Sequence, residues 1–263
     1  MREALKWGLL NYGWPVARLM LAARPGMSLS KFSAAHIRPG DRILDIGAHK
    51  GVTASFFACC VGPQGHVHAI EPNPALRGFL ENAKARSRWP NISLHYVALS
   101  DVAGDLEFFA DIGPTAMAST LSQEHVQREA KTHGATFTSI KVPALTLDQF
   151  CAAKRIIPNL IKIDVEGTED AVIRGGMDTI RNHRPVVWFE CWCGYENGQP
   201  INSRLAHIRT LQELGYRLFV ASVIEKGGRF ILQEDAENVR DLVPLTDDIL
   251  RGPTTAIDVA AIP

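Results

Sequence analysis

The stretch RILDIGAHKG, from Arg42 to Gly51, joins a short apolar run to an abrupt glycine-rich turn. The run has the length and composition of a buried strand. Gly47 and Gly51 carry no Cβ atom, so the turn leaves room for a ligand close to the backbone. In open parallel sheets, ligands bind outside the carboxyl ends of the strands, where the strand order reverses. We therefore expect this turn to contact a ligand.

The turn lacks the G-x-G-x-x-G spacing that accommodates the diphosphate of a dinucleotide. His49 occupies the second glycine position of that motif, and its side chain would crowd a diphosphate at the following helix N-terminus. A nucleoside that carries an amino-acid tail and no phosphate fits better. An NAD-dependent oxidoreductase is therefore a weaker interpretation.

A second motif, HVHAIEPNP, ends a strand-like run with Glu71. This is about where a dinucleotide fold places the acid that accepts hydrogen bonds from the ribose hydroxyls. Pro72 and Pro74 then end the strand and begin a helix, because proline suits a first helical turn. An adenosine with an amino-acid tail and no phosphate describes S-adenosylmethionine, which is the predicted cofactor.

Apolar strands and helical stretches alternate after Gly40, which predicts a parallel sheet covered by helices on both faces. The runs LIKID and PVVWFE fit strands that are buried on both sides. The predicted fold class is α/β, a Rossmann-like doubly wound sheet that is mostly parallel with a C-terminal antiparallel strand. The expected strands are Arg42–Ile46, His66–Ile70, Ile92–Ala98, Leu160–Asp164, Val186–Glu190, Arg217–Ala221 and Arg229–Leu232. The expected helices are Val52–Cys60, Pro74–Ser87, Thr168–Arg181 and Ser203–Leu214.

The chain has 263 residues, which suits one large α/β domain with appendages. We expect an N-terminal helical extension at 1–39, the sheet domain at 40–232 and a peripheral tail at 233–263. Residues 104–145 break the alternation and are expected to form an insertion over the mouth of the site. The N-terminal helices are expected to pack on the domain, with a substrate lid or a contact with a membrane surface as the less favoured alternatives.

Charge and cysteine content narrow the choice of partners. Lys+Arg and Asp+Glu each number 28, so the formal net charge is zero, which argues against a nucleic-acid partner. A neutral or locally recognised substrate fits this balance better. The 5 cysteines show no disulfide or zinc spacing, which indicates reduced thiols and a cytoplasmic location. Expected edge strands and the apolar N-terminal segment are compatible with a homodimer.

A third motif, LIKIDVEGTEDAVIRGG, follows a buried strand with several acids. Asp164 ends that strand, Glu166 follows two residues later, and Glu190 ends the next strand. The carboxyl ends of neighbouring parallel strands share one edge of a sheet, so the three carboxylates are expected to converge there. Glu169 and Asp170 are interpreted instead as acids of a first helical turn.

Six strings in this order resemble the FkbM family of methyltransferases over residues 40 to 220. They are DIGAHKG, IEPNP, ALSDVAGDLEFF, TLDQF, IKIDVEGTEDAVIRGG and RPVVWFE. The resemblance implies a class I methyltransferase fold, the cofactor S-adenosylmethionine with S-adenosylhomocysteine as product, and methyl transfer to an oxygen. Family members act on hydroxyls of sugars, polyketides and other natural products, so the resemblance implies a small-molecule or glycan acceptor. The position of His49 more often holds Asn in the family.

Carried onto this chain, the resemblance implies the following cofactor-binding residues. The methionine part would lie among Asp45, Gly47, Ala48, His49 and Gly51. Glu71 would hold the ribose, with Pro72 beside it, and Ala98, Leu99 and Ser100 would lie near the adenine. Asp164 would lie where the methyl donor faces the acceptor.

A hydroxyl is a poor nucleophile at neutral pH, so a general base near the acceptor is expected. Asp164 or Glu190 is the expected base, Glu166 would orient the acceptor, and His49 is the second choice as base. Metal ligands are not expected, although the same acids could hold a divalent cation in a metal-assisted methyltransferase. A non-catalytic protein that only binds S-adenosylmethionine is the remaining alternative.

Overall fold

The computed structural model describes residues 36–112, 119–193, 195–196, 199–200, 206–225, 229–231, 243–245 and 255–263 of the 263-residue chain. Apart from residues 36–39, the expected N-terminal extension lies outside the described residues. No helix in the described ranges combines the length and the apolar character that a membrane crossing requires.

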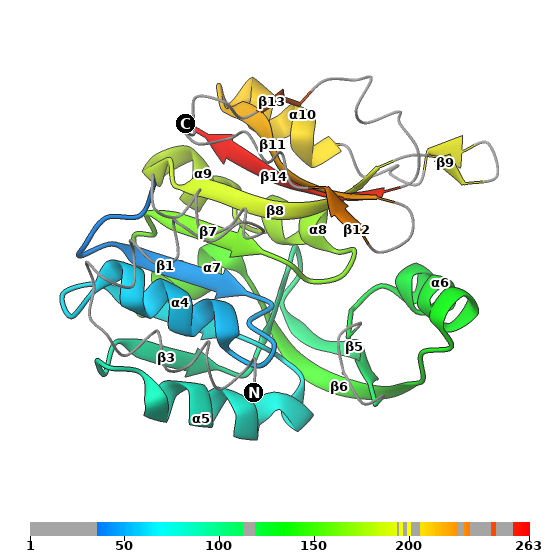
Figure 1. Ribbon diagram of the computed structural model, residues 1–263, viewed down its shortest axis with the longest axis horizontal. Helices are drawn as coiled ribbons and strands as arrows, with labels where there is room; N and C mark the ends of the chain where they lie inside the picture. Colours follow the sequence, from blue (N-terminus) through cyan, green and yellow to red (C-terminus); the bar gives the residue numbers. More distant parts are fainter. Residues whose placement is uncertain are drawn as a thin grey trace.

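In the described part of the chain, nine strands form one mixed sheet (Figure 1). The strand order is β12-β11-β14-β8-β7-β1-β2-β3, and β13 pairs with β11. Neighbours from β3 to β8 run parallel, whereas β14 is antiparallel to both β8 and β11. The strands are β1 (Arg42–Ile46), β2 (His66–Ile70), β3 (Ile92–His95), β7 (Leu160–Ile163), β8 (Val186–Cys193), β11 (Arg217–Glu225), β12 (Arg229–Ile231), β13 (Val243–Pro244) and β14 (Thr255–Ile262).

Helices cover both faces of this sheet. One apolar core lies between the sheet and the helices α4 (Val52–Val61) and α5 (Arg77–Arg86). A single 3-10 turn, η1 (Pro74–Leu76), immediately precedes α5. The other core lies beneath α7 (Leu147–Lys154), α8 (Glu169–Arg174), α9 (Met177–His183) and α10 (Ala206–Glu213). Alternation along β1 explains this division, because Ile43 belongs to the first core and Leu44 and Ile46 belong to the second.

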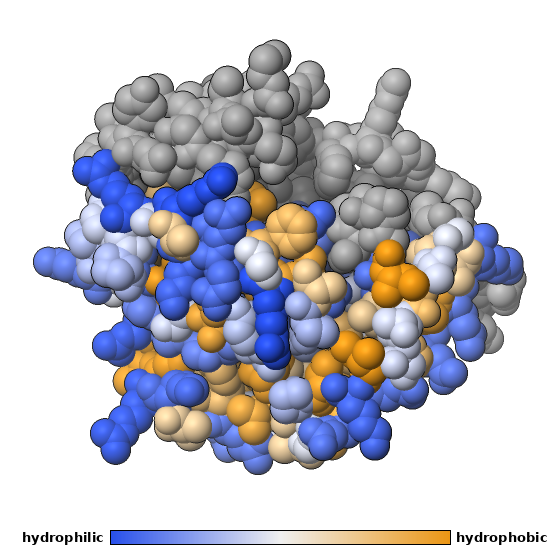
Figure 2. All heavy atoms as spheres, turned by 90° about the horizontal axis from the view of Figure 1, so that it is seen from below, coloured by the Kyte–Doolittle hydropathy of each residue, from blue (hydrophilic) through white to orange (hydrophobic). Residues whose placement is uncertain are grey.

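The outer face of α5 is mostly polar, since the helix buries only Leu80 and Ala83. Figure 2 views the molecule from this side, and hydrophilic side chains there are mixed with scattered hydrophobic ones. Such a surface is ordinary for a helix that packs one stripe against a sheet.

The segment that breaks the alternation forms a second, smaller sheet beside the carboxyl ends of the main strands (Figure 1). Its strands are β4 (Ala98–Ser100), β5 (Gly104–Asp111) and β6 (Phe137–Thr146), in the order β4-β6-β5. Helix α6 (Gln123–His133) lies between β5 and β6 in the sequence and begins with a cap from Ser122. Two further short strands, β9 (Tyr195–Glu196) and β10 (Gln199–Pro200), pair with each other.

The sequence analysis is confirmed in its fold class, but several elements need correction. Residues 255–262 are not a peripheral tail, because β14 lies inside the sheet and pairs with β8 and β11. The expected helix Thr168–Arg181 is divided at Gly175 and Gly176. A Cβ atom on Gly175 would lie 2.1 Å from the Ser100 carbonyl oxygen, so this close approach requires glycine.

Candidate active site

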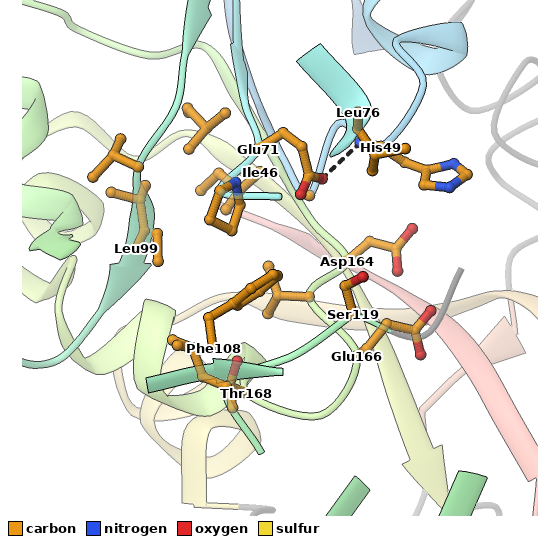
Figure 3. Close-up of a pocket in the computed structure, with 17 residues that line it drawn as sticks. Ile46, His49, Glu71, Leu76, Leu99, Phe108, Ser119, Asp164, Glu166 and Thr168 are labelled. Carbon is orange, nitrogen blue, oxygen red and sulfur yellow. Dashed lines mark hydrogen bonds between the residues drawn. The ribbon is translucent and has the colours of Figure 1, made fainter. Parts of the chain in front are cut away.

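A pocket lies at the carboxyl ends of β1 and β7, where the chain order of the sheet reverses. Residues of the insertion, from β5 and from the segment before α6, also line it. The lining residues are Ile46, Gly47, His49, Ile70, Glu71, Pro72, Leu76, Val97, Ala98, Leu99, Phe108, Ser119, Leu121, Asp164, Val165, Glu166 and Thr168. Figure 3 shows the apolar side chains Leu99 and Phe108 on one side and the acids Asp164 and Glu166 on the other.

Glu71 is held at the end of β2 by the backbone of two neighbouring turns. Its Oε2 accepts a hydrogen bond from the His49 N–H at 2.9 Å, and its Oε1 accepts one from the Asn73 N–H at 2.9 Å (Figure 3). Burial raises the pKa of the Glu71 carboxyl to about 7, although these N–H groups oppose the shift. Each carboxylate oxygen keeps a second lone pair, so Glu71 can still accept hydrogen bonds from a ligand diol.

The glycine turn after β1 approaches the loop after β7 so closely that a side chain at Gly47 would not fit. Gly47 has a φ of +76°, and a Cβ atom there would lie 1.8 Å from the carbonyl oxygen of Asp164. His49 is also left-handed, with a φ of 49°, which directs its backbone N–H at Glu71. Its imidazole extends toward the side of the pocket on which Asp164 and Glu166 lie (Figure 3).

Lys162 connects the first motif, RILDIGAHKG, with the third motif, LIKIDVEGTEDAVIRGG. Its Nζ lies 3.0 Å from the Gly47 carbonyl oxygen, 3.4 Å from Asp45 Oδ1 and 3.0 Å from Asp164 Oδ2. Burial alone would lower the pKa of this ammonium group, but the Asp164 and Asp45 carboxylates raise it above its usual value. The sequence analysis did not assign Lys162 to the site, because it interpreted LIKID as a buried apolar strand. The one sequence signal was the lysine itself, since a charged residue inside an otherwise apolar strand needs a partner.

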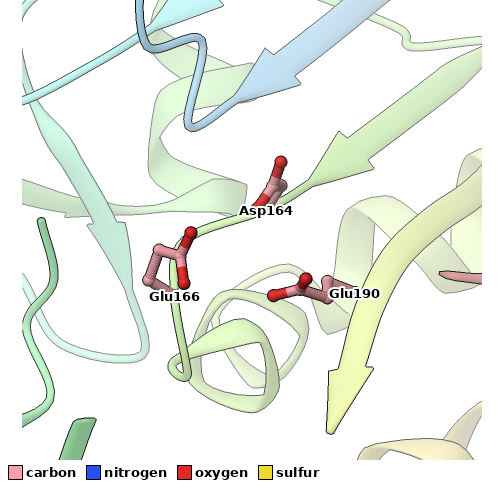
Figure 4. Close-up of side chains that lie close together, drawn as sticks. All are labelled: Asp164, Glu166 and Glu190. Atoms are coloured by element: carbon pink, nitrogen blue, oxygen red, sulfur yellow. The ribbon is translucent and has the colours of Figure 1, made fainter. Parts of the chain in front are cut away.

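Three carboxylates converge at the mouth of the pocket, as the sequence predicted. Oxygen atoms of Asp164, Glu166 and Glu190 all lie within 4.8 Å of one another. Figure 4 shows Glu190 reaching from β8 toward Glu166. Burial raises the pKa of Glu166 well above its usual value, and the charges of Glu190 and Asp164 add to this shift. Glu166 therefore holds a proton more tightly than an isolated glutamate.

The insertion contacts Glu166 through two side chains. Thr120 Oγ1 donates a 2.8 Å hydrogen bond to the Glu166 carbonyl oxygen, and His125 Nε2 lies 3.3 Å from Glu166 Oε2. Thr120 and His125 are both buried, whereas 27% of the Glu166 side chain is exposed. These contacts hold Glu166 in a left-handed conformation, with a φ of 57°. Sequence reasoning did not assign Thr120 to the site. It considered a substrate contact for His125 but favoured a solvated surface position, whereas the structure buries this residue.

Glu169 stabilises the loop that contains Glu166 through hydrogen bonds to its backbone. Its Oε1 accepts hydrogen bonds from the N–H groups of Val165 at 3.0 Å and Gly167 at 3.2 Å. Asp170 pairs with Arg174 one helical turn later. Both acids therefore belong to the start of α8, and neither lines the pocket.

Several predicted cofactor-binding residues lie behind the pocket wall. Asp45 is fully buried and faces Lys162, so it supports the turn from inside. Ala48 is buried in the core beneath α4. A Cβ atom on Gly51 would lie 2.8 Å from Ala83, so this glycine permits α4 and α5 to pack closely. Ser100 is buried and donates to Asp101. None of these four residues lines the pocket, whereas Gly47, His49, Glu71, Pro72, Ala98, Leu99 and Asp164 do.

The pocket residues fit S-adenosylmethionine. Ile46, Ile70, Leu99 and Phe108 offer apolar walls for a purine. Glu71 offers carboxylate oxygens to a diol. The acids at the mouth favour a cationic group such as a sulfonium.

Comparisons with known proteins find similarity to methyltransferases. A family model described as the methyltransferase FkbM domain matches residues 45–218. The chain is 27% identical over 148 residues to the hexuronic acid methyltransferase AglP of Haloferax volcanii, which covers 56% of this chain and 54% of that protein. It is 33% identical over 91 residues to a protein-L-isoaspartate O-methyltransferase of Ignicoccus hospitalis, which covers 35% of this chain and 40% of that protein.

These matches span about half or less of the length of the curated relatives. Among solved structures, the methyltransferase FkbM of Methylobacillus flagellatus superposes with a TM-score of 0.47 at 12% identity. That superposition covers 99% of this chain and 59% of that one.

Proposed function

The chain belongs to the FkbM methyltransferase family, and from that premise we propose that it methylates a hydroxyl oxygen of a sugar, glycan or polyketide-type natural product. Its cofactor is S-adenosylmethionine, which supplies an already activated methyl group when bound. The remaining task of the protein is to align the acceptor and to take its proton. The observation that carries the proposal is the convergence of Asp164, Glu166 and Glu190 at the pocket mouth.

The charge of this mouth favours a neutral hydroxyl over a carboxylate as acceptor. Three acids within 4.8 Å of one another would repel an anionic acceptor, whereas each can accept a hydrogen bond from a hydroxyl. The similarity to a hexuronic acid methyltransferase supports a carbohydrate acceptor. A hexuronic acid offers both hydroxyls and a carboxylate. Methylation of a hydroxyl would give an ether, whereas methylation of the carboxylate would give an ester, so the chemical class of the product distinguishes the two acceptors.

We assign proton acceptance to Glu166 and orientation of the acceptor to Asp164 and Glu190. Glu166 suits proton acceptance, because burial and neighbouring acids raise its pKa. The Lys162 ammonium group lies 3.0 Å from Asp164 Oδ2, so Asp164 is already engaged in an ion pair. This assignment exchanges the roles that were expected from the sequence alone.

A metal-assisted methyl transfer is the second candidate, because the same three carboxylates have a spacing that suits a divalent cation. In that case, the three acids would bind the ion, and the ion would lower the pKa of the acceptor hydroxyl. Treatment with EDTA distinguishes the two candidates. Retained turnover supports proton acceptance by Glu166, whereas a loss that Mg²⁺ restores supports the metal.

The deciding experiment uses methyl-labelled S-adenosylmethionine and a panel of free sugars, hexuronic acids and polyhydroxylated polyketides. We expect a labelled product that survives mild alkali, since an ether is stable there and a methyl ester is not. The variant Glu166→Gln should lower turnover about a hundredfold or more while S-adenosylhomocysteine still binds. An alkali-labile or N-methylated product would contradict transfer to a hydroxyl, and full turnover in Glu166→Gln would contradict the assignment of the base.

A further inference from the structure

A second hollow, of about 470 Å³, lies at the end of the sheet opposite the cofactor pocket. We call it the amino-end hollow, because β1 begins in it at Arg42 and β2 begins in it at His66. Figure 1 shows the end of the sheet at which the arrows of β1 and β7 start, and Arg42 at the start of β1 is one of the residues that line the hollow. Its lining residues are Arg42, Pro63, Gln64, Gly65, His66, His68, Pro90, Asn91, Lys154, Arg155 and Ile156.

The lining carries three permanent positive charges and no carboxylate. Arg42 comes from a strand, whereas Lys154 and Arg155 come from the end of α7. In the part of the chain that the structure describes, no ion pair joins any of these three cations to an acid. The whole chain has a formal net charge of zero, so this concentration of positive charge among the described lining residues is local.

A row of imidazoles lies beneath these cations. His66 and His68 have ring centroids 4.8 Å apart, and His68 Nδ1 lies 3.1 Å from His95 Nε2 on the neighbouring strand. Burial lowers the pKa of His68 to about 3 and that of His95 to about 4. Positive neighbours, among them Arg42 and Lys154, lower these values further, and no acid is among the causes. The histidines thus respond to the same uncompensated positive field.

Packing alone does not explain this arrangement. Lys154 lies in the last turn of α7, where its positive charge stabilises the helix by interacting with the carbonyl groups at the C-terminal end. The same argument does not apply to Arg42, His66 or His68, which come from strands and share the hollow with that lysine. Asn91 is not available to a ligand, because its Nδ2 donates to the carbonyl oxygens of Ala58 and Gly62.

We propose that the amino-end hollow binds a soluble molecule that carries a phosphoryl group. Guanidinium and ammonium groups are the side chains that phosphoryl oxygens prefer, and imidazole N–H groups can add hydrogen bonds. The site is separate from the methyl-transfer pocket, which lies at the other end of the same strands. The proposal does not depend on which acceptor is methylated.

Inorganic pyrophosphate is the probe, titrated calorimetrically at low ionic strength into the full chain saturated with S-adenosylhomocysteine. We expect a dissociation constant below about 1 mM that weakens as sodium chloride is added. The double variant Arg42→Gln/Lys154→Gln should weaken binding about tenfold or more. Its matched control is Lys131→Gln/Arg209→Gln, which removes the same charge from exposed positions on α6 and α10 and should bind as the wild type does.

Proton NMR of the histidine rings locates the anion independently. Signals of His66 and His68 should shift on titration, while that of His183, exposed on α9, should stay in place. The proposal is overturned if pyrophosphate does not bind at about 1 mM. It is equally overturned if both double variants bind alike, which indicates an adventitious ion only, or if S-adenosylhomocysteine competes with pyrophosphate. Because the readout is binding without turnover, it stands or fails separately from the proposed methyl transfer.

Discussion

At the scale of single residues, the buried ammonium group of Lys162 links the glycine turn to the loop that begins at Asp164. It lies 3.4 Å from Asp45 Oδ1 and 3.0 Å from Asp164 Oδ2. The variant Lys162→Met would leave the fully buried Asp45 without its counter-charge, so we expect the free energy of unfolding to fall by about 3 kcal/mol or more. Urea unfolding measures this change.

The matched control for that variant is Asp45→Asn/Lys162→Met, which removes both buried charges at once. Its free energy of unfolding should lie within about 1 kcal/mol of the wild type, because replacing a buried pair by neutral groups is often tolerated. If Lys162→Met alone proved as stable as the wild type, the ion pair would not contribute to stability.

We expect Glu71 to make cofactor affinity depend on pH. Burial raises its pKa to about 7, so the carboxylate that would accept hydrogen bonds from a ribose is fully present only above that pH. Between pH 8 and pH 6, the ionised fraction falls about tenfold, and we expect the affinity for S-adenosylhomocysteine to fall by a similar factor. Calorimetric titration across this range measures the effect.

The variant Glu71→Gln should bind S-adenosylhomocysteine more weakly than the wild type at pH 8 and show little change down to pH 6. Its amide cannot ionise, and one of its two acceptor oxygens is lost. A wild-type affinity that stayed constant from pH 8 to pH 6 would mean that the Glu71 carboxyl does not hold the ribose.

At the scale of elements, the insertion acts on the main domain through Thr120. Its Oγ1 donates to the Glu166 carbonyl oxygen at 2.8 Å. The variant Thr120→Val keeps the shape and removes the donor, so the free energy of unfolding should fall by about 1–2 kcal/mol. Hydrogen exchange of residues 164–168 should become faster, and methyl transfer slower, because Glu166 loses the contact that fixes its conformation.

The control is Thr138→Val, at an exposed position of β6. It makes the same chemical change in the insertion without touching Glu166, and we expect neither property to change. Unaltered hydrogen exchange in residues 164–168 of Thr120→Val would show that the insertion does not position the loop.

At the scale of the whole molecule, the position of β14 decides which residues are core. Val259 is fully buried between β8 and β11, where it pairs with Phe189 and Val220. The variant Val259→Asp should lower the free energy of unfolding by more than about 4 kcal/mol or prevent folding. The control Val102→Asp, at a position with 52% exposure, should change it by less than about 0.5 kcal/mol. Equal stability of the two variants would contradict a buried β14.

Alternation and turn chemistry made much of this fold predictable. The bounds of β1 and β2 match the expected strands, because each is a short apolar run bordered by glycine or proline. Helix α7 was missed although Thr146 and Gln149 form a capping box, which is itself a sequence signal for a helix start. Strand β14 was missed because no local sequence pattern specifies the strands with which it pairs.

The site was predictable where the sequence places a glycine turn or an acid at or near a strand end. Asp164, Glu166 and Glu190 converge because neighbouring parallel strands end at the same edge. Thr120 and His125 could not be assigned, since they reach Glu166 across 46 and 41 residues of sequence through a tertiary contact. Asp45 was placed in the pocket because its position in the motif does not reveal that its side chain points at Lys162.

The late arrival of β14 has a consequence for synthesis on the ribosome. Strand β8 ends at Cys193, yet the neighbour that covers its outer edge begins only at Thr255. Until the residues of β14 have left the exit tunnel, the growing chain exposes an unpaired edge on β8, and that edge can pair with another nascent chain. Slow translation of this last segment should therefore lower the yield of folded protein, and chaperones that shield strand edges should raise it.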